Sequence, residues 1–354
     1  MNLNITIAGT GNVGTTLAAD LSRKGHMVTV LKTSDKYSSD HYDMMKRTKT
    51  ISVLDDYTGN YTAKIHNVTE SFEEVVSAAD VIIICVQTNY HEEIIRKMSS
   101  FLKDGQIIMF VPGYLSTCYV LKHCSQKLLC IEMESSPIDC RLDSPCVSNV
   151  LFKNVINPVG VYPKAEAERA RKVIDKLGFP YRLTSCVTEA ALHNPNLIVH
   201  TVGSIFSIPR IEITNGEYWM YREVFTPHVW NVCESLDDEK ISVMRALGIE
   251  KEQRYVEACQ ERNFINDKRS PLDAFFDYAK NSSPKGPSVP DSRYITEDVS
   301  QGLVLLESLG AFAGVPTPTC TSLINIANAA LATDFRKCGR TISKLGIENV
   351  KILN

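Results

Sequence analysis

The stretch Leu3-Asn-Ile-Thr-Ile-Ala-Gly-Thr-Gly-Asn-Val-Gly-Thr-Thr-Leu17 decides the fold of the first half of the chain. An apolar run ends in a G-x-G-x-x-G pattern, and apolar residues at helical spacing follow it. The first glycine permits a tight turn, the second lets the backbone approach a pyrophosphate, and the third lets helix and strand pack closely. Free N–H groups at the start of the helix favour phosphate binding. The pattern therefore predicts a dinucleotide site formed by Gly9, Thr10, Gly11, Asn12, Val13 and Gly14.

Strand-like and helical segments alternate through the rest of the first half. The β-branched run at 81–86 is typical of a parallel strand buried on both faces. Further strands are expected at 27–31, 107–111, 128–132 and 150–156, and a helix is expected at 164–177. This alternation predicts an α/β domain over residues 1–180, a doubly wound parallel sheet of the Rossmann type.

The second half has a different hydrophobic pattern, because helical periods dominate and strand-like runs are few. Helices are expected at 189–200, 227–247, 250–262, 272–280, 295–313 and 319–333. A loop rich in proline and serine separates two of them at 281–292, and its length is typical of a functional or mobile loop. We therefore predict an all-α substrate domain over residues 181–354.

Charge and composition limit the class of partner. The 354 residues include 38 Lys plus Arg and 41 Asp plus Glu, a formal net charge of −3 that does not favour nucleic acid or an anionic membrane. The longest apolar run, at 81–86, is far shorter than the ~20 residues that cross a bilayer. The amino terminus lacks the pattern of a signal peptide, and the 11 cysteines form no C-x-x-C pair. We expect a cytoplasmic protein with small-molecule substrates; the sequence leaves a homodimer open.

The end of the second strand distinguishes NAD from NADP. Lys32-Thr33-Ser34 offers one cation and two hydroxyls there, a set that suits a 2′-phosphate better than a free ribose diol. Asp35 is the competing residue, since it lies near the offset at which NAD enzymes place an acid. We predict a preference for NADP(H), with NAD(H) as the alternative.

Two turns after later strands are further candidates for the cofactor site. Val86-Gln87 follows one strand and Pro112-Gly113 follows the next. Ligands in such sheets lie beyond the carboxyl ends of the strands, so Val86 and Gln87 are expected to border the ribose and nicotinamide. An ordinary turn explains these residues equally well.

Candidate proton-transfer residues stand in two runs of the second half. His193-Asn-Pro-Asn-Leu-Ile-Val-His200 begins a helix, and Arg293-Tyr-Ile-Thr-Glu-Asp298 enters an apolar helix. By spacing alone, His200 is more typical of a core histidine than of a catalyst, and Asp298 of a carboxylate stabilised by a helix dipole. The histidines are followed by no ligand triad at a recognised spacing, so no metal site is predicted.

Together with Gly314-Val-Pro-Thr-Pro318, these runs resemble the opine dehydrogenases of the octopine/nopaline type over essentially the whole chain. The resemblance implies an enzyme that condenses an α-keto acid, often pyruvate, with the amino group of an L-amino acid and reduces the imine with NAD(P)H. It implies His200 as catalytic base and acid, Asp298 as its carboxylate partner, Arg293 as the residue that grips a substrate carboxylate, and Cys140 and Asn194 as substrate contacts.

Two other functions stay open on the sequence. A 2-hydroxyacid or ketopantoate-type reductase would share the nucleotide domain, and a non-catalytic regulator would bind NADP(H) without turnover. The residue types favour the condensation, because a histidine with an ordinary pKa of ~6.5 moves protons near neutral pH. If the amine carries a basic side chain, we expect Glu217, Glu223 or Asp237 to meet it.

Overall fold

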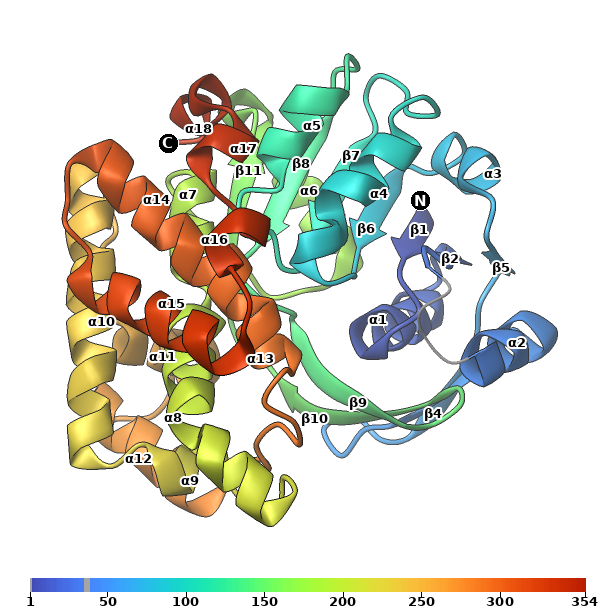
Figure 1. The fold of residues 1–354 in the computed structure, drawn as a ribbon. Coiled ribbons are helices and arrows are strands. Elements are labelled where there is room, and N and C mark those ends of the chain that lie inside the picture. The colour runs from blue at the N-terminus through green and yellow to red at the C-terminus, as the bar shows by residue number, and fades with distance from the viewer. Residues whose placement is uncertain (1, 35–38) are drawn as a thin grey trace. The chain divides into compact units, whose positions relative to one another are not determined.

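A computed structural model describes residues 2–34 and 39–354 of the chain. Its internal contacts divide the chain into two units, Met1–Leu183 and Thr184–Asn354, and each is described by itself (Figure 1). Asp35, the residue that competes with Lys32 for the ribose, lies outside the described residues.

The first unit is built on an eight-stranded sheet in the order β12-β11-β8-β7-β6-β1-β2-β5. Every neighbouring pair is parallel except β11 and β8, which are antiparallel. The predicted Rossmann-type parallel sheet is thus confirmed, except that β11 and β12 run antiparallel to the other six strands, which the sequence pattern did not reveal. The strands are β1 (Asn4–Ala8), β2 (Met27–Leu31), β5 (Asn67–Thr69), β6 (Val81–Ile84), β7 (Ile107–Phe110), β8 (Leu129–Met133), β11 (Pro158–Tyr162) and β12 (Arg182–Leu183).

Short helices connect these strands. They are α1 (Asn12–Arg23), α2 (Ser39–Thr48), α3 (Phe72–Val76), η1 (Thr88–Tyr90), α4 (His91–Met98), α5 (Thr117–His123), η2 (Lys164–Glu166) and α6 (Ala167–Leu177). The last of them ends at Gly178 in the left-handed conformation, as a helix stop with glycine predicts.

A second sheet was not expected from the sequence. Its strands are β3 (Thr50–Leu54), β4 (Tyr61–Lys64), β9 (Ile138–Ser144) and β10 (Val147–Lys153), in the order β4-β3-β10-β9. Figure 1 shows α1 between the two sheets, and α1 contacts all four strands of the second one. The prediction that 150–156 joins the main sheet was wrong. The strand there is β10, whose buried and exposed residues alternate because only one face packs on α1.

The glycine turn after β1 is held by close packing. Gly9 has φ +125°, and a side chain on it would meet the Cys85 carbonyl oxygen at 2.9 Å. A side chain on Gly14 would collide with the Gly9 carbonyl oxygen, whereas one on Gly11 meets nothing within 4 Å. Gly9 and Gly14 are therefore required by the fold, and Gly11 faces open space.

Residues 184–354, all of which the structure describes, form no strand, so the predicted all-α second unit is confirmed. Its helices α8, α10, α14 and α15 contact one another in the core. Within the described residues, no helix is both long and apolar enough to cross a membrane. The helices are α7 (Val187–Leu192), η3 (Pro195–Leu197), α8 (Val199–Thr214), α9 (Met220–Val224), α10 (Pro227–Ala246), α11 (Tyr255–Asn263), α12 (Pro271–Asn281), α13 (Arg293–Thr296), η4 (Asp298–Leu303), α14 (Val304–Ala313), α15 (Pro318–Leu331), α16 (Phe335–Cys338), α17 (Ile342–Leu345) and α18 (Ile347–Ile352).

Two of the predicted helices are divided. The helix expected at 189–200 is interrupted at Pro195, because proline lacks the N–H that a helix interior needs, and α8 then continues to Thr214. The helix expected at 295–313 contains a π-helical segment, η4, between α13 and α14. Such segments are rare and often lie at functional sites.

The glycine packing gives a stability prediction. Gly14→Ala is expected to lower the free energy of unfolding by about 2–3 kcal/mol, because the new methyl group would overlap the Gly9 carbonyl. Gly11→Ala is the matched control and should cost less than about 1 kcal/mol, since its methyl group meets open space. Urea denaturation followed by circular dichroism measures both values. Equal losses for the two variants would contradict this account of the turn.

Candidate active site

The glycine turn and the start of α1 fit a dinucleotide. Gly11 directly precedes α1, and the space where a side chain of residue 11 would lie is empty. No side chain of residue 11 therefore covers the start of α1, where the first N–H groups of the helix are available to a phosphate. Asn12 holds this end of the helix against the second sheet, because its Oδ1 accepts a hydrogen bond from the Leu142 N–H at 3.0 Å. The predicted residues Gly9 to Gly14 therefore form a glycine turn before a helix, the arrangement that dinucleotide sites of this type use for a pyrophosphate.

A buried histidine that the sequence did not single out supports the glycine turn. The Cys146 N–H donates to His41 Nδ1 at 3.0 Å, so the ring carries its proton on Nε2, which donates to Thr15 Oγ1 at 3.0 Å. Thr15 Oγ1 then donates to the Thr10 carbonyl at 3.2 Å. This chain of hydrogen bonds requires a neutral ring. Burial lowers the pKa of His41 below its ordinary value of 6.5, although the Thr10 backbone carbonyl, as a hydrogen-bond acceptor, partly opposes the shift.

Lys32 stands directly after β2, where the sequence predicted it. Its Nζ lies 3.5 Å from Glu70 Oε1 and 4.6 Å from the ring centroid of Tyr42. Burial, together with a hydrogen bond to Glu70, raises the pKa of Tyr42 to about 12, so this phenol stays neutral beside the lysine. Thr33, which is half-buried, and Ser34, which is exposed, follow Lys32 directly in the sequence.

The turns after β6 and β7 are linked through His91, which is fully buried. Its Nε2 lies 3.1 Å from the Val86 carbonyl oxygen, and its Nδ1 lies 2.6 Å from Ser116 Oγ. Ser116 Oγ also donates to the Gly113 carbonyl at 2.6 Å. The structure thus joins the turn at Val86-Gln87 to the turn at Gly113. No spacing rule identifies His91, because its partners are a backbone carbonyl, which every residue carries, and a serine 25 positions away.

Cys140 lies at the same end of the first unit. It is buried on β9, and the pKa of the neighbouring Cys85 thiol, at the end of β6, is raised first by burial and then by Cys140. The glycine turn also packs on Cys85. The structure therefore brings Cys140 close to the predicted cofactor residues.

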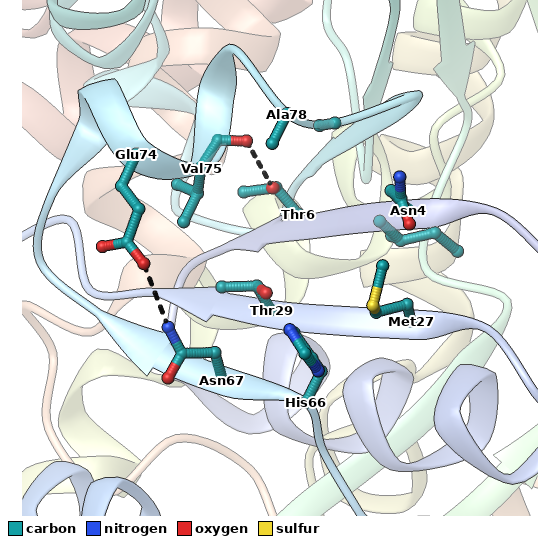
Figure 2. A pocket seen from close by; sticks show the side chains of 11 residues that line it. Asn4, Thr6, Met27, Thr29, His66, Asn67, Glu74, Val75 and Ala78 are labelled. Carbon is teal, nitrogen blue, oxygen red and sulfur yellow. Dashed lines mark hydrogen bonds between the residues drawn. The ribbon is translucent and has the colours of Figure 1, made fainter.

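Two cavities lie away from these residues. One of about 240 Å³ lies at the amino ends of β1 and β2, where Asn4, Met27 and Glu74 line it (Figure 2). The glycine turn follows the carboxyl end of β1, so this cavity is not the cofactor site. The other, of about 300 Å³, belongs to the second unit and is lined by Trp230 and Tyr255 among others, but not by His200.

In the second unit, His200 and Asp298 meet although 98 positions separate them. His200 Nδ1 lies 2.9 Å from Asp298 Oδ2, and both residues are buried. The carboxylate therefore fixes the proton on Nδ1 and leaves Nε2 as the nitrogen that can exchange a proton. α8 supplies the histidine, and the first residue of the π-helical segment η4 supplies the acid.

Tyr294 is a site residue to which the sequence assigned no role. Its ring stacks on the His200 imidazole with centroids 3.7 Å apart and planes inclined by 6°. Tyr294 and Asp298 are four positions apart, a spacing that puts both side chains on one helix face and could have identified the pair. Arg293 Nη1 lies 3.6 Å from Glu297 Oε2, and the arginine side chain is 41% exposed.

Asn194 is buried, and its Oδ1 accepts a hydrogen bond from the Asn196 N–H at 2.9 Å. Its Nδ2 has no hydrogen-bond partner among the described residues. A buried donor left in this state costs about 1–3 kcal/mol, which makes it a candidate to bind an acceptor on a ligand. The described residues contain no group of three His, Cys, Asp or Glu side chains placed to hold a metal ion.

The three acids named for a basic amine are each engaged by a cation of the protein. The pairs are Glu217 with Lys285 at 2.7 Å, Glu223 with Arg210 at 2.9 Å and Asp237 with Lys240 at 2.6 Å. None of the three carboxylates is therefore left as an evident receptor for a basic side chain.

Comparisons with known proteins agree with this architecture. Residues 184–331 match the family described as NAD/NADP octopine/nopaline dehydrogenase, alpha-helical domain, and residues 4–111 match NADP oxidoreductase, coenzyme F420-dependent. An opine dehydrogenase of Arthrobacter sp. (strain 1C) is 28% identical over 352 residues, which cover 97% of this chain and 95% of the relative.

Two solved structures share the fold at low sequence identity. Octopine dehydrogenase in complex with NADH and agmatine has a TM-score of 0.79 and 17% identity, covering 99% of this chain and 98% of that one. Yersinopine dehydrogenase with NADP+ bound has a TM-score of 0.74 and 14% identity, covering 100% and 95%.

The His41 hydrogen bonds give a prediction of pH dependence. Because the folded pKa lies below 6.5, the unfolded chain takes up this proton first as the pH falls. The free energy of unfolding should therefore decrease as the pH falls through 6.5 towards the folded pKa. Urea denaturation at pH 7.5 and at pH 5.5 measures how much the free energy of unfolding changes between the two pH values. This change should be smaller in His41→Gln than in the parent. His66→Gln, at an exposed histidine, should leave the difference unchanged; an unchanged difference in His41→Gln would refute the assignment.

Proposed function

The chain belongs to the opine dehydrogenase family, as the sequence resemblance predicted, and from this premise we propose the reaction that it catalyses. It is an NAD(P)-dependent oxidoreductase that acts on a CH–NH bond. We propose that it condenses an α-keto acid with the amino group of an L-amino acid and reduces the resulting imine to an N-(carboxyalkyl)amino acid. The hydrogen bond between His200 and Asp298 carries this proposal, because imine formation needs a proton relay.

His200 handles the protons of the condensation in this proposal. The amine attacks the keto carbon to form a carbinolamine, and Nε2 of His200 accepts the proton that the nitrogen loses. The same atom passes this proton to the former keto oxygen, which becomes the hydroxyl of the neutral carbinolamine. Nε2 then takes up a second proton from solvent and donates it to the hydroxyl, which leaves as water and gives the protonated imine. Asp298 stabilises the imidazolium between these steps and holds Nδ1 protonated.

Arg293 and Asn194 would orient the substrates. A guanidinium binds a carboxylate with two hydrogen bonds, so Arg293 is the proposed partner of the keto-acid carboxylate. The buried Nδ2 of Asn194 offers a further donor to a substrate oxygen. Orientation by these groups would decide which face of the imine receives the hydride.

The first unit would hold the cofactor, which supplies the hydride when bound. Gly9 to Gly14 would cradle the pyrophosphate, Lys32-Thr33-Ser34 would meet the adenosine ribose, and Val86, Gln87 and Cys140 would border the nicotinamide half. The Lys32 cation supports a preference for a 2′-phosphate, and yersinopine dehydrogenase, a structural relative, is described with NADP+ bound. NAD(H) is the alternative, since octopine dehydrogenase is described with NADH.

Membership in the family favours this reaction over a ketopantoate-type reductase and over a non-catalytic NADP(H)-binding regulator.

A cytoplasmic location is part of the proposal, and the eleven cysteines, all free thiols in the structure, support a reducing compartment.

The reaction is tested by a matrix of amino acids against keto acids. NADPH absorbance should fall only in wells that contain both substrates, because the imine forms from the pair. His200→Gln should lower kcat by roughly 10²–10⁴-fold while NADPH still binds, since it removes only the proton relay. Equal turnover with a keto acid alone would rule out the condensation and favour a 2-keto-acid reductase.

Cofactor choice is tested at Lys32. Lys32→Asp should reverse the preference towards NADH by at least tenfold in kcat/KM, because it removes the cation and adds an acceptor for the ribose diol. Lys46→Ala is the matched control, since Lys46 Nζ also lies over the Tyr42 ring, at 5.5 Å, but outside the strand end. Unchanged preference in Lys32→Asp would show that residues elsewhere select the nucleotide.

A further inference from the structure

The stacked pair of Tyr294 and His200 is closer and flatter than an ordinary packing contact. Aromatic pairs in proteins commonly have centroids 4.5–7 Å apart, often edge to face. Here the centroids are 3.7 Å apart and the planes are inclined by only 6°. One face of the imidazole is therefore covered by the electron-rich face of a phenol, while Asp298 occupies Nδ1 in the plane of the ring.

The helix around Tyr294 makes this geometry rigid. Tyr294 and Asp298 lie four positions apart on a continuous helical segment, so the stacking ring and the carboxylate approach His200 together. The Tyr294 side chain packs against the buried apolar cluster of Ile211, Tyr218, Met220 and Val224. These contacts restrict the movement of the Tyr294 ring.

We propose that Tyr294 is a positioning residue that acts through His200: it fixes the plane in which Nε2 exchanges protons and stabilises the imidazolium through a cation–π interaction. The proposal rests on the function assigned to the dyad above. A protonated imidazole is a cation, and the face of a tyrosine ring attracts cations within about 6 Å of its centroid. The stack therefore favours the charged form of His200 over the neutral form.

Other charged groups near the dyad are engaged by partners of their own. Arg293 lies 5.6 Å from the Tyr294 centroid and opposes the imidazolium, but Glu297 lies 3.6 Å from its guanidinium. η3 and α15, which pack on α8, carry no Asp, Glu, Lys, Arg or His. On α8, α9 and α10, Arg210 pairs with Glu223, and Lys240 pairs with Asp237. Asp238 pairs with Arg254, and Arg245 pairs with Glu252. Glu239 accepts hydrogen bonds from the N–H groups of Thr319 and Cys320, and Arg222 stacks on Trp219. Glu212, His228 and Glu234 are exposed.

The stack is tested directly by NMR on the free protein. With ¹³C-labelled histidine, the His200 ring protons should resonate upfield of the exposed histidines, because the tyrosine ring current shields them. The signal is assigned by its loss in His200→Gln. The titration midpoint of this ring should fall by about 0.5 pH unit in Tyr294→Leu, the shift that a cation–π interaction of ordinary strength produces.

Tyr294→Phe is the matched control, because it keeps the aromatic face and removes only the hydroxyl. It should restore both the upfield shift and the midpoint of the parent. If Tyr294→Leu unfolds, the spectra of the parent and of Tyr294→Phe still test whether the tyrosine ring stacks on His200. Absence of the upfield shift in both proteins would contradict the stacking. A folded Tyr294→Leu with an unchanged midpoint would overturn the cation–π role.

Kinetics separate this proposal from the proposed function. The acid limb of the pH profile of kcat/KM should move with the NMR midpoint in Tyr294→Leu and stay in place in Tyr294→Phe. The NMR experiment contains no substrate, so the stack can fail while the enzyme still condenses its substrates. Conversely, a chain that shows the stack but no two-substrate turnover would refute the reaction and leave the geometry intact.

Discussion

The hydrogen bond between His200 Nδ1 and Asp298 Oδ2, 2.9 Å long, is the interaction on which the proposed proton relay depends. It joins two helices of the second unit that are distant in sequence. By holding the proton on Nδ1, it assigns Nε2 as the atom that exchanges protons in the proposed reaction. Without the carboxylate, the buried imidazole would have no fixed tautomer and no counter-charge for its protonated form.

Contacts around the π-helical segment η4 support the position of Asp298. η4 begins at Asp298, and the helix continues through it from α13 to α14. Arg340 is buried against this π-helical segment, where its N–H donates to the Ser300 carbonyl at 2.8 Å and its Nε donates to Gln301 Oε1 at 3.1 Å. A π-helical turn has irregular backbone bonding, so these contacts replace part of what a regular helix would supply.

Much of the first unit could be predicted from local pattern. The glycine motif and the run Val81–Ile84 identify a parallel sheet, because glycine and buried β-branched residues have strong local preferences. The second sheet could not be predicted, since β3 and β10 pair across a long separation in sequence. His41 and His91 were missed for the same reason: the Cys146 N–H and Ser116 Oγ that they contact are distant in sequence and come near only in the fold.

The sequence by itself determined most element types and the glycine turn, and a resemblance of spaced motifs pointed to the opine dehydrogenases. Hydrophobic patterns and motif spacings can be read from neighbouring residues without knowledge of the fold. Only the tertiary structure decided which side chains meet: the sequence named His200 and Asp298 separately, but their contact and the stack of Tyr294 on the ring depend on how the helices pack. Packing depends on the whole unit, because each of these contacts joins side chains from helices that are distant in sequence.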